Sequence, residues 1–108
     1  MGRSDSLLGT LELLILKTLA RGPNHGFGIT LHVQTVSDGL LRMEEGSLYP
    51  ALHRLEKDKL VRGAWRQTEN TRKARFYTLT AAGQRRLAEA ETNWAAVSRG
   101  VQRVLRFA

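Results

Sequence analysis

The sequence has no cysteine and no long hydrophobic run. Without cysteine, the chain can form neither a disulfide framework nor a metal site with thiolate ligands. The longest apolar run, Leu13–Leu16, is far too short to cross a bilayer. The first residues lack the basic and apolar segments of a secretory signal. Met1–Ser6 fits the loose N-myristoylation template, but so short a pattern often arises by chance. We therefore expect a cytoplasmic protein with no membrane contact and a flexible tail over residues 1–9.

The sequence also lacks the residue patterns that are typical of catalysis. It contains no Ser-His-Asp set and no glycine-rich phosphate loop. Glu44 and Glu45 are adjacent, so their carboxylates point in different directions and do not form an acid–base pair. His25, His32 and His53 do not have the spacing of metal ligands. These absences predict a protein that is not an enzyme and that needs neither a metal nor a cofactor.

The charge of the chain is strongly one-sided. Its 108 residues include 17 Lys and Arg but only 10 Asp and Glu, which gives a formal net charge of +7. A chain of this length forms one domain of ordinary size with a modest core. Excess positive charge on a small domain favours a polyanionic partner such as DNA.

Helical periodicity covers the first half of the chain. Apolar residues recur every three or four positions over Thr10–Ala20, and a Gly-Pro pair then ends this helix. We expect a second helix from about His25, with Asn24 as its cap, to the Ser37–Gly39 segment. A third helix is expected after Glu44–Gly46.

The two faces of the third helix differ in chemistry. At about 100° per residue, four apolar residues form one stripe that predicts a core face: Leu48, Ala51, Leu52 and Leu55. A proline is tolerated in the first turn, where N–H groups have no partner within the helix. The other side carries the candidate DNA contacts of this helix: Ser47, Tyr49, Pro50, His53, Arg54 and Lys57. The plainer alternatives are a half-buried packing role for Tyr49 and a merely solvated face for the basic residues.

Two alternating runs, Leu60–Gln67 and Arg75–Thr80, predict a β-hairpin with the polar segment Thr68–Ala74 at its tip. Between Arg62 and Arg75 the sequence has five basic residues and one acid. Three of the basic residues are candidate phosphate contacts: Arg72, Lys73 and Arg75. For Arg75, an ion pair with an acid of the fold is the alternative.

Three helices followed by a basic hairpin is the order of a winged helix-turn-helix. In that fold a helix enters the DNA major groove and the hairpin, or wing, contacts the neighbouring backbone. We therefore predict an α+β fold, mainly α, with a DNA-binding domain over residues 10–80.

A long helix capped by Thr80 is expected over residues 81–108. Its apolar positions are three and four residues apart, which is the spacing of a two-stranded helical seam. The rest of the chain is too small to cover this helix on all sides, so the stripe predicts a homodimer. The expected interface residues are Leu87, Ala90, Trp94, Val97, Val101 and Val104, with Ala108 continuing the pattern.

Several of these segments together resemble a known family. They are Leu13–Leu19, His25–Ile29, Gly46–Glu56 with its Gly-Ser-Leu-Tyr-Pro start, and Lys73–Gly83 with its Tyr-x-Leu-Thr motif. They are similar to the PadR family of bacterial transcriptional regulators, in particular its small subgroup with a single C-terminal dimerisation helix. The resemblance implies a homodimeric winged-helix repressor that binds a palindromic DNA operator. The wing tip, Glu69–Arg72, departs from the family because many relatives have glycine there.

Two other functions compete with a DNA-binding repressor. A winged helix can act as a protein-interaction adaptor, although an adaptor does not need five positive charges on its wing. The chain could also be a small-molecule sensor, because relatives in the resembled family sometimes bind flat apolar effectors between aromatic residues of the dimer helices. Trp94 would then contact a small apolar effector, whereas its plainer role is packing.

Overall fold

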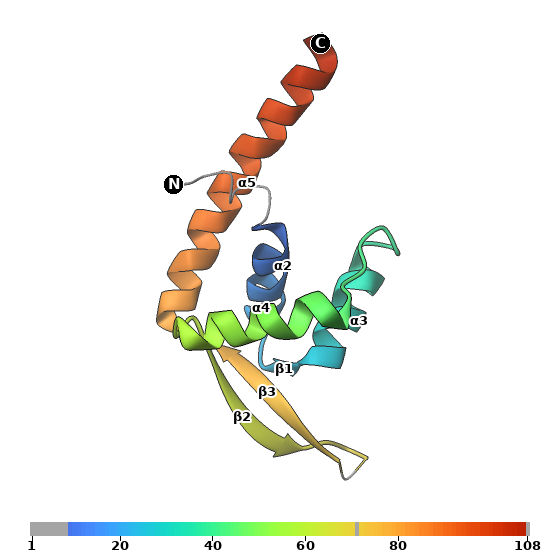
Figure 1. Cartoon of the computed structure of the whole chain (residues 1–108), viewed down its shortest axis with the longest axis vertical. Coiled ribbons are helices and arrows are strands. Elements are labelled where there is room, and N and C mark those ends of the chain that lie inside the picture. Colours follow the sequence, from blue (N-terminus) through green and yellow to red (C-terminus); the bar gives the residue numbers. More distant parts are fainter. Residues whose placement is uncertain (1–8, 71, 108) are drawn as a thin grey trace.

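The computed structural model describes residues 9–70 and 72–107 as a winged helix with one long projecting helix (Figure 1). The expected tail over residues 1–9 lies outside the described residues except for Gly9, as do the myristoylation pattern, Thr71 and Ala108. In chain order the elements are α2 (Thr10–Leu19), β1 (Asn24–His25), α3 (Gly26–Val36), α4 (Glu45–Lys57), β2 (Val61–Gln67), β3 (Lys73–Leu79) and α5 (Ala81–Phe107). The predicted fold, a mainly helical winged helix-turn-helix, is confirmed.

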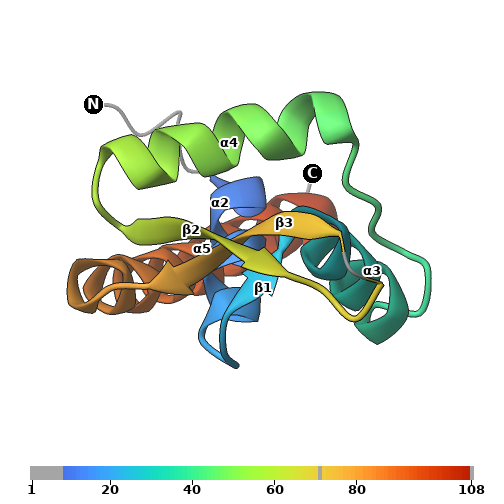
Figure 2. The same cartoon turned by 90° about the horizontal axis from the view of Figure 1, so that it is seen from below.

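The core lies where α2, α3 and α4 meet the base of the hairpin. The predicted apolar stripe of α4 is buried as expected, and α2 and α3 add Ile15, Leu16, Ile29 and Val33. Met43, which precedes α4, and Tyr77, from β3, also belong to this core, although neither was predicted to be buried. Figure 2 shows α4 lying along one side of the sheet, with α3 at the end of the sheet near the wing tip.

The beginnings of α3 and α4 differ from the sequence-based expectation. His25, rather than Asn24, caps α3, because its Nδ1 accepts a hydrogen bond from the Gly28 N–H at 3.1 Å. Asn24 instead accepts from the His25 N–H at 2.8 Å. Helix α4 begins at Glu45, so Pro50 lies inside the helix rather than in its first turn. Proline has no N–H to donate to the carbonyl four residues earlier, and this position therefore lacks one helical hydrogen bond.

The sheet has three antiparallel strands in the order β1-β3-β2. The hairpin pairs Val61 with Leu79 at its base and Gln67 with Lys73 near its tip. The short strand β1, which joins the other edge of β3, was not predicted, because two residues are too few to show an alternating pattern. As expected, Thr80 caps α5, since its Oγ1 accepts from the Gly83 N–H at 3.0 Å. The same hydroxyl contacts the Lys59 carbonyl at 2.8 Å.

Helix α5 has 27 residues and is about 40 Å long. Its first half packs on α2, where Lys17 pairs with Glu91 at 2.8 Å and Arg86 with Glu12 at 2.7 Å. Its second half projects away from the domain, so that the C-terminus and the wing lie at opposite ends of the long axis (Figure 1). The described helices include none that is long and apolar enough to cross a membrane.

Candidate nucleic-acid interface

The predicted contact face of α4 is accessible to a partner. The four residues of the apolar stripe face the core. All six candidate residues are exposed: Ser47, Tyr49, Pro50, His53, Arg54 and Lys57. The predicted division of this helix into two faces is therefore confirmed. That these side chains contact DNA stays a prediction.

Tyr49 combines the two roles considered for it. Its side chain is 46% exposed, yet its ring also covers the start of α3. A Cβ atom at Gly26 would lie 2.5 Å from the Tyr49 hydroxyl, so only glycine leaves room for this ring. Tyr49 therefore joins α4 to the N-terminus of α3, and its remaining surface is available to a ligand.

The tip of the wing carries exposed positive charge. Arg72 and Lys73 are both exposed, and the turn before them is closed by the Thr68 N–H, which donates to the Arg72 carbonyl at 2.6 Å. Arg66, on the opposite strand, lies over the ring of Phe76, with its guanidinium carbon 4.6 Å from the ring centre. The hairpin thus presents a cluster of cations suited to polyanion binding.

Arg75 does not belong to this exposed cluster, and it makes the ion pair with an acid of the fold that was its alternative role. Its Nη2 atom donates to Oε2 of Glu56 on α4, and both side chains are about two-thirds buried. A carboxylate already balances its charge. Close by, burial raises the pKa of Tyr77, although the Arg75 cation opposes this shift. Sequence periodicity could not predict this ion pair, because it relates residues a few positions apart, whereas Glu56 and Arg75 are 19 positions apart.

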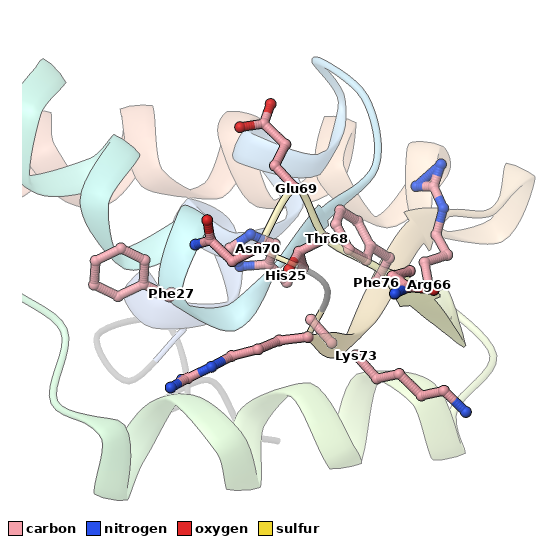
Figure 3. Close-up of a pocket in the computed structure, with 11 residues that line it drawn as sticks. His25, Phe27, Arg66, Thr68, Glu69, Asn70, Lys73 and Phe76 are labelled. Atoms are coloured by element: carbon pink, nitrogen blue, oxygen red, sulfur yellow. The ribbon is translucent and has the colours of Figure 1, made fainter.

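An open cavity of about 730 Å³ lies between the wing tip and the start of α3 (Figure 3). Three cations, Arg66, Arg72 and Lys73, line it against one acid, Glu69. Aromatic rings form other parts of its wall. His25 meets the ring of Phe76 edge-on with 4.9 Å between ring centres, and Phe27 is 68% exposed.

The sequence analysis did not place His25 and Phe27 near the wing. The missing signal was β1, which brings the start of α3 against β3. The cavity extends the positive surface beyond the two tip residues. Among the residues that the structure describes, no group of His, Cys, Asp and Glu could hold a metal ion.

The predicted dimer stripe divides into two parts. Leu87 is 5% exposed and belongs to the core of its own chain, so its assignment to the dimer interface is wrong. Further along α5 the stripe becomes accessible, because α2 no longer covers it: Ala90 and Val97 are half-buried, and Trp94, Val101 and Val104 are 43%, 46% and 63% exposed. Leu105 and Phe107, which were not predicted, are also exposed apolar residues of α5.

Comparisons with known proteins agree with this fold. A structure of a transcriptional regulator from Clostridium thermocellum superposes with a TM-score of 0.81 at 24% identity and covers 92% of this chain and 96% of its own. A PadR-like transcriptional regulator from Bacillus cereus is 28% identical, with a TM-score of 0.75 and coverage of 96% and 99%. An uncharacterized 37.1 kDa protein in a transposon of Streptomyces fradiae is 42% identical over 82 residues, 76% of this chain but only 22% of that protein.

The family comparison covers most of the chain. The model of the transcriptional regulator PadR-like family matches residues 15–89, which include the core, the helix α4, the wing and the first third of α5. Family and fold are those of transcriptional regulators. The chain belongs to the PadR-like family of transcriptional regulators.

Proposed function

We propose that this protein is a homodimeric, sequence-specific repressor that binds a palindromic DNA operator. The observation that carries the proposal is the pairing of two different surfaces. The exposed face of α4 offers polar side chains that suit base edges, and the wing beside it offers Arg72 and Lys73, which suit phosphates. We also propose that the protein works in the cytoplasm.

The proposed division of labour assigns DNA binding to residues 10–80 and dimerisation to residues 81–108. The accessible stripe of α5 supports the second assignment, since an isolated chain leaves Val101 and Val104 in water. A two-fold dimer carries two recognition helices and matches two half-sites about one DNA turn apart. Two copies together carry a formal charge of +14, twice that of one chain.

The salt dependence of binding tests the wing. A dimer that neutralises about 6–10 phosphates should lose about 10³–10⁵ in affinity between roughly 50 and 200 mM salt. The probes are a duplex selected from a random library by the protein itself and an unselected duplex of equal length. Replacing Arg72 and Lys73 with Ala should weaken binding to both and flatten the salt slope.

The matched control removes two positive charges elsewhere. Arg103→Ala with Arg106→Ala acts on exposed arginines at the far end of α5. The slope should stay close to that of the wild type, since the screening length is about 8 Å at 0.15 M salt. Equal flattening by both pairs, or no flattening by the wing pair, would remove the wing from the interface. Binding that does not respond to salt would favour the adaptor function.

Specificity tests the face of α4. Arg54→Ala and Ser47→Ala should reduce the preference for the selected duplex over the unselected one more than they reduce binding to the latter. Base contacts contribute about 1–3 kcal/mol each to discrimination. A uniform loss on both duplexes would make these residues positioning contacts.

A small apolar effector is the second candidate ligand. It is favoured by the exposure of Trp94, an aromatic ring on the accessible stripe of α5. In a dimer this ring would lie at the seam, where a flat apolar molecule could stack on it. Quenching of Trp94 fluorescence by flat aromatic compounds, measured in a Trp65→Phe background, tests this site.

A further inference from the structure

Helix α4 and the wing are joined at one end by a tight turn. Helix α4 ends at Lys57, Asp58 is its C-cap, and Lys59 takes a left-handed conformation with φ of 63°. The Leu60 N–H then donates to the Leu55 carbonyl at 2.9 Å, and β2 begins at Val61. Beyond this turn the hairpin extends away from the domain (Figure 1). The pairing of β1 with β3 and the burial of Val61 and Tyr77 anchor the base of the hairpin, and contacts further along it add to the definition of the angle between the wing and α4.

The Glu56–Arg75 ion pair is such a contact. It connects the last turns of α4 with the middle of β3 and crosses the angle between the two elements. The guanidinium also lies near two aromatic rings. It lies 5.9 Å from the ring centre of Trp65 and 6.0 Å from that of Tyr77, both on the hairpin. These distances are at the outer limit for cation–π attraction.

Gly63 provides the space for this arrangement. A Cβ atom at Gly63 would lie 2.7 Å from Nε of Arg75, so a larger residue would displace the guanidinium. In the strand register, Gly63 pairs with Tyr77 and Trp65 with Arg75. The side chains that frame Arg75 therefore come from adjacent cross-strand pairs on one face of the hairpin, the face turned toward α4.

We propose that the Glu56–Arg75 pair is a strut that sets the angle of the wing relative to the recognition helix, and that Arg75 is a positioning residue rather than a phosphate contact. The inference rests on the proposed function, in which α4 and the wing bind one DNA molecule together. A duplex presents its groove and its phosphates at a fixed separation, so that a wing at the wrong angle reaches them less well.

Removing Glu56 changes DNA affinity in one direction through its charge and in the opposite direction through loss of the strut. Removing Glu56 deletes a negative charge close to a polyanion, and charge alone would then make DNA binding tighter. Loss of the strut makes binding to the selected duplex weaker. The two explanations therefore predict changes in opposite directions for Glu56→Ala. Circular dichroism and thermal unfolding check that the variant stays folded, because removing one member of a largely buried ion pair also costs folding free energy.

The experiment measures affinity for the selected and unselected duplexes with full-length protein. Glu56→Ala and Arg75→Ala should each weaken binding to the selected duplex by about tenfold, the scale of coupling between contacting residues. Arg75→Ala should leave the salt slope unchanged, unlike the wing-tip pair. The reversed pair, Glu56→Arg with Arg75→Glu, should recover most of the lost affinity. Glu44→Ala, which removes an exposed acid whose side chain makes no capping bond, is the charge control and should bind slightly more tightly.

A readout without DNA separates the strut from the proposed function. In a Trp94→Phe background, Trp65 is the remaining tryptophan. Its fluorescence should become more accessible to acrylamide in Glu56→Ala, because Arg75 then loses the partner that holds it near the indole. If wild-type protein binds neither duplex, the proposed function fails, and this quenching decides whether the pair holds the wing. Any of three results contradicts the proposal. They are Glu56→Ala binding the selected duplex as tightly as Glu44→Ala, Arg75→Ala flattening the salt slope, and Glu56→Ala leaving Trp65 quenching unchanged.

Discussion

The two halves of α5 carry the same apolar spacing but have different surroundings. In the first half, Leu87 is 5% exposed, and Arg86 and Glu91 are tied to α2 by ion pairs. In the second half, Val101 and Val104 are 46% and 63% exposed, although they continue the same stripe. A regular period therefore identifies the buried side of a helix, but it does not say which surface buries it. The first half is covered by its own chain, and we propose that a second chain covers the rest.

The largest expected effect comes from Val101→Glu in the accessible half. A glutamate at the seam would be desolvated opposite its own copy, which is costly, so the dimer should dissociate while the domain stays folded. Loss of one half-site should reduce affinity for the selected duplex by about a thousandfold or more, toward non-specific binding. Sedimentation and circular dichroism check the two parts. A folded dimer with full affinity would mean that another surface makes the dimer.

Leu87→Ala, in the covered half, should act on the fold instead. Truncating a buried leucine leaves a cavity and costs about 2–5 kcal/mol in the free energy of unfolding. Denaturant titration at a fixed chain concentration measures this loss. The matched variant is Val104→Ala, whose cost should disappear when the protein is diluted below its dimer dissociation constant. If Leu87→Ala and Val104→Ala respond alike to dilution, the contrast between the two halves is wrong.

Gly100→Ala should produce a smaller change of opposite sign. Glycine inside a helix costs about 0.5–1 kcal/mol relative to alanine, and a Cβ at Gly100 would meet nothing within 4 Å in the single chain. The variant should therefore unfold at a higher temperature. If it stabilises the protein only when diluted, the partner helix must approach closely at Gly100, which would locate the tightest part of the seam.

The smallest effect is expected from Arg86→Ala. Its hydrogen bond to Glu12 raises the pKa of Arg86, but the side chain is 44% exposed. An ion pair so accessible to water contributes about 0.2–1 kcal/mol and weakens in salt. A double-mutant cycle with Glu12→Ala measures the coupling. A coupling well above this range would mean that the pair, and not Leu87, determines how α5 sits on α2.

Sequence patterns predicted those parts of the site that depend on one element. The period of α4 separated its core stripe from Arg54 and the other candidate contacts, and the cap at Thr80 followed from its place before a helix. The pattern failed where two distant segments meet. His25 caps α3, whereas Asn24 was expected to, because β1 aligns this segment with β3. Likewise, Gly26 leaves room for the ring of Tyr49, which is 23 positions away in the sequence.

The amino-acid sequence by itself determined the order of the elements, the face that each helix buries and the concentration of positive charge on the hairpin. These properties follow from the geometry of the backbone and the local spacing of side chains. The tertiary structure alone decided which of several eligible partners each side chain meets. Arg75 could have met a phosphate or an acid, and Leu87 a second chain or its own core. Such choices depend on distances between segments far apart in the chain, and only packing of the whole domain sets those distances.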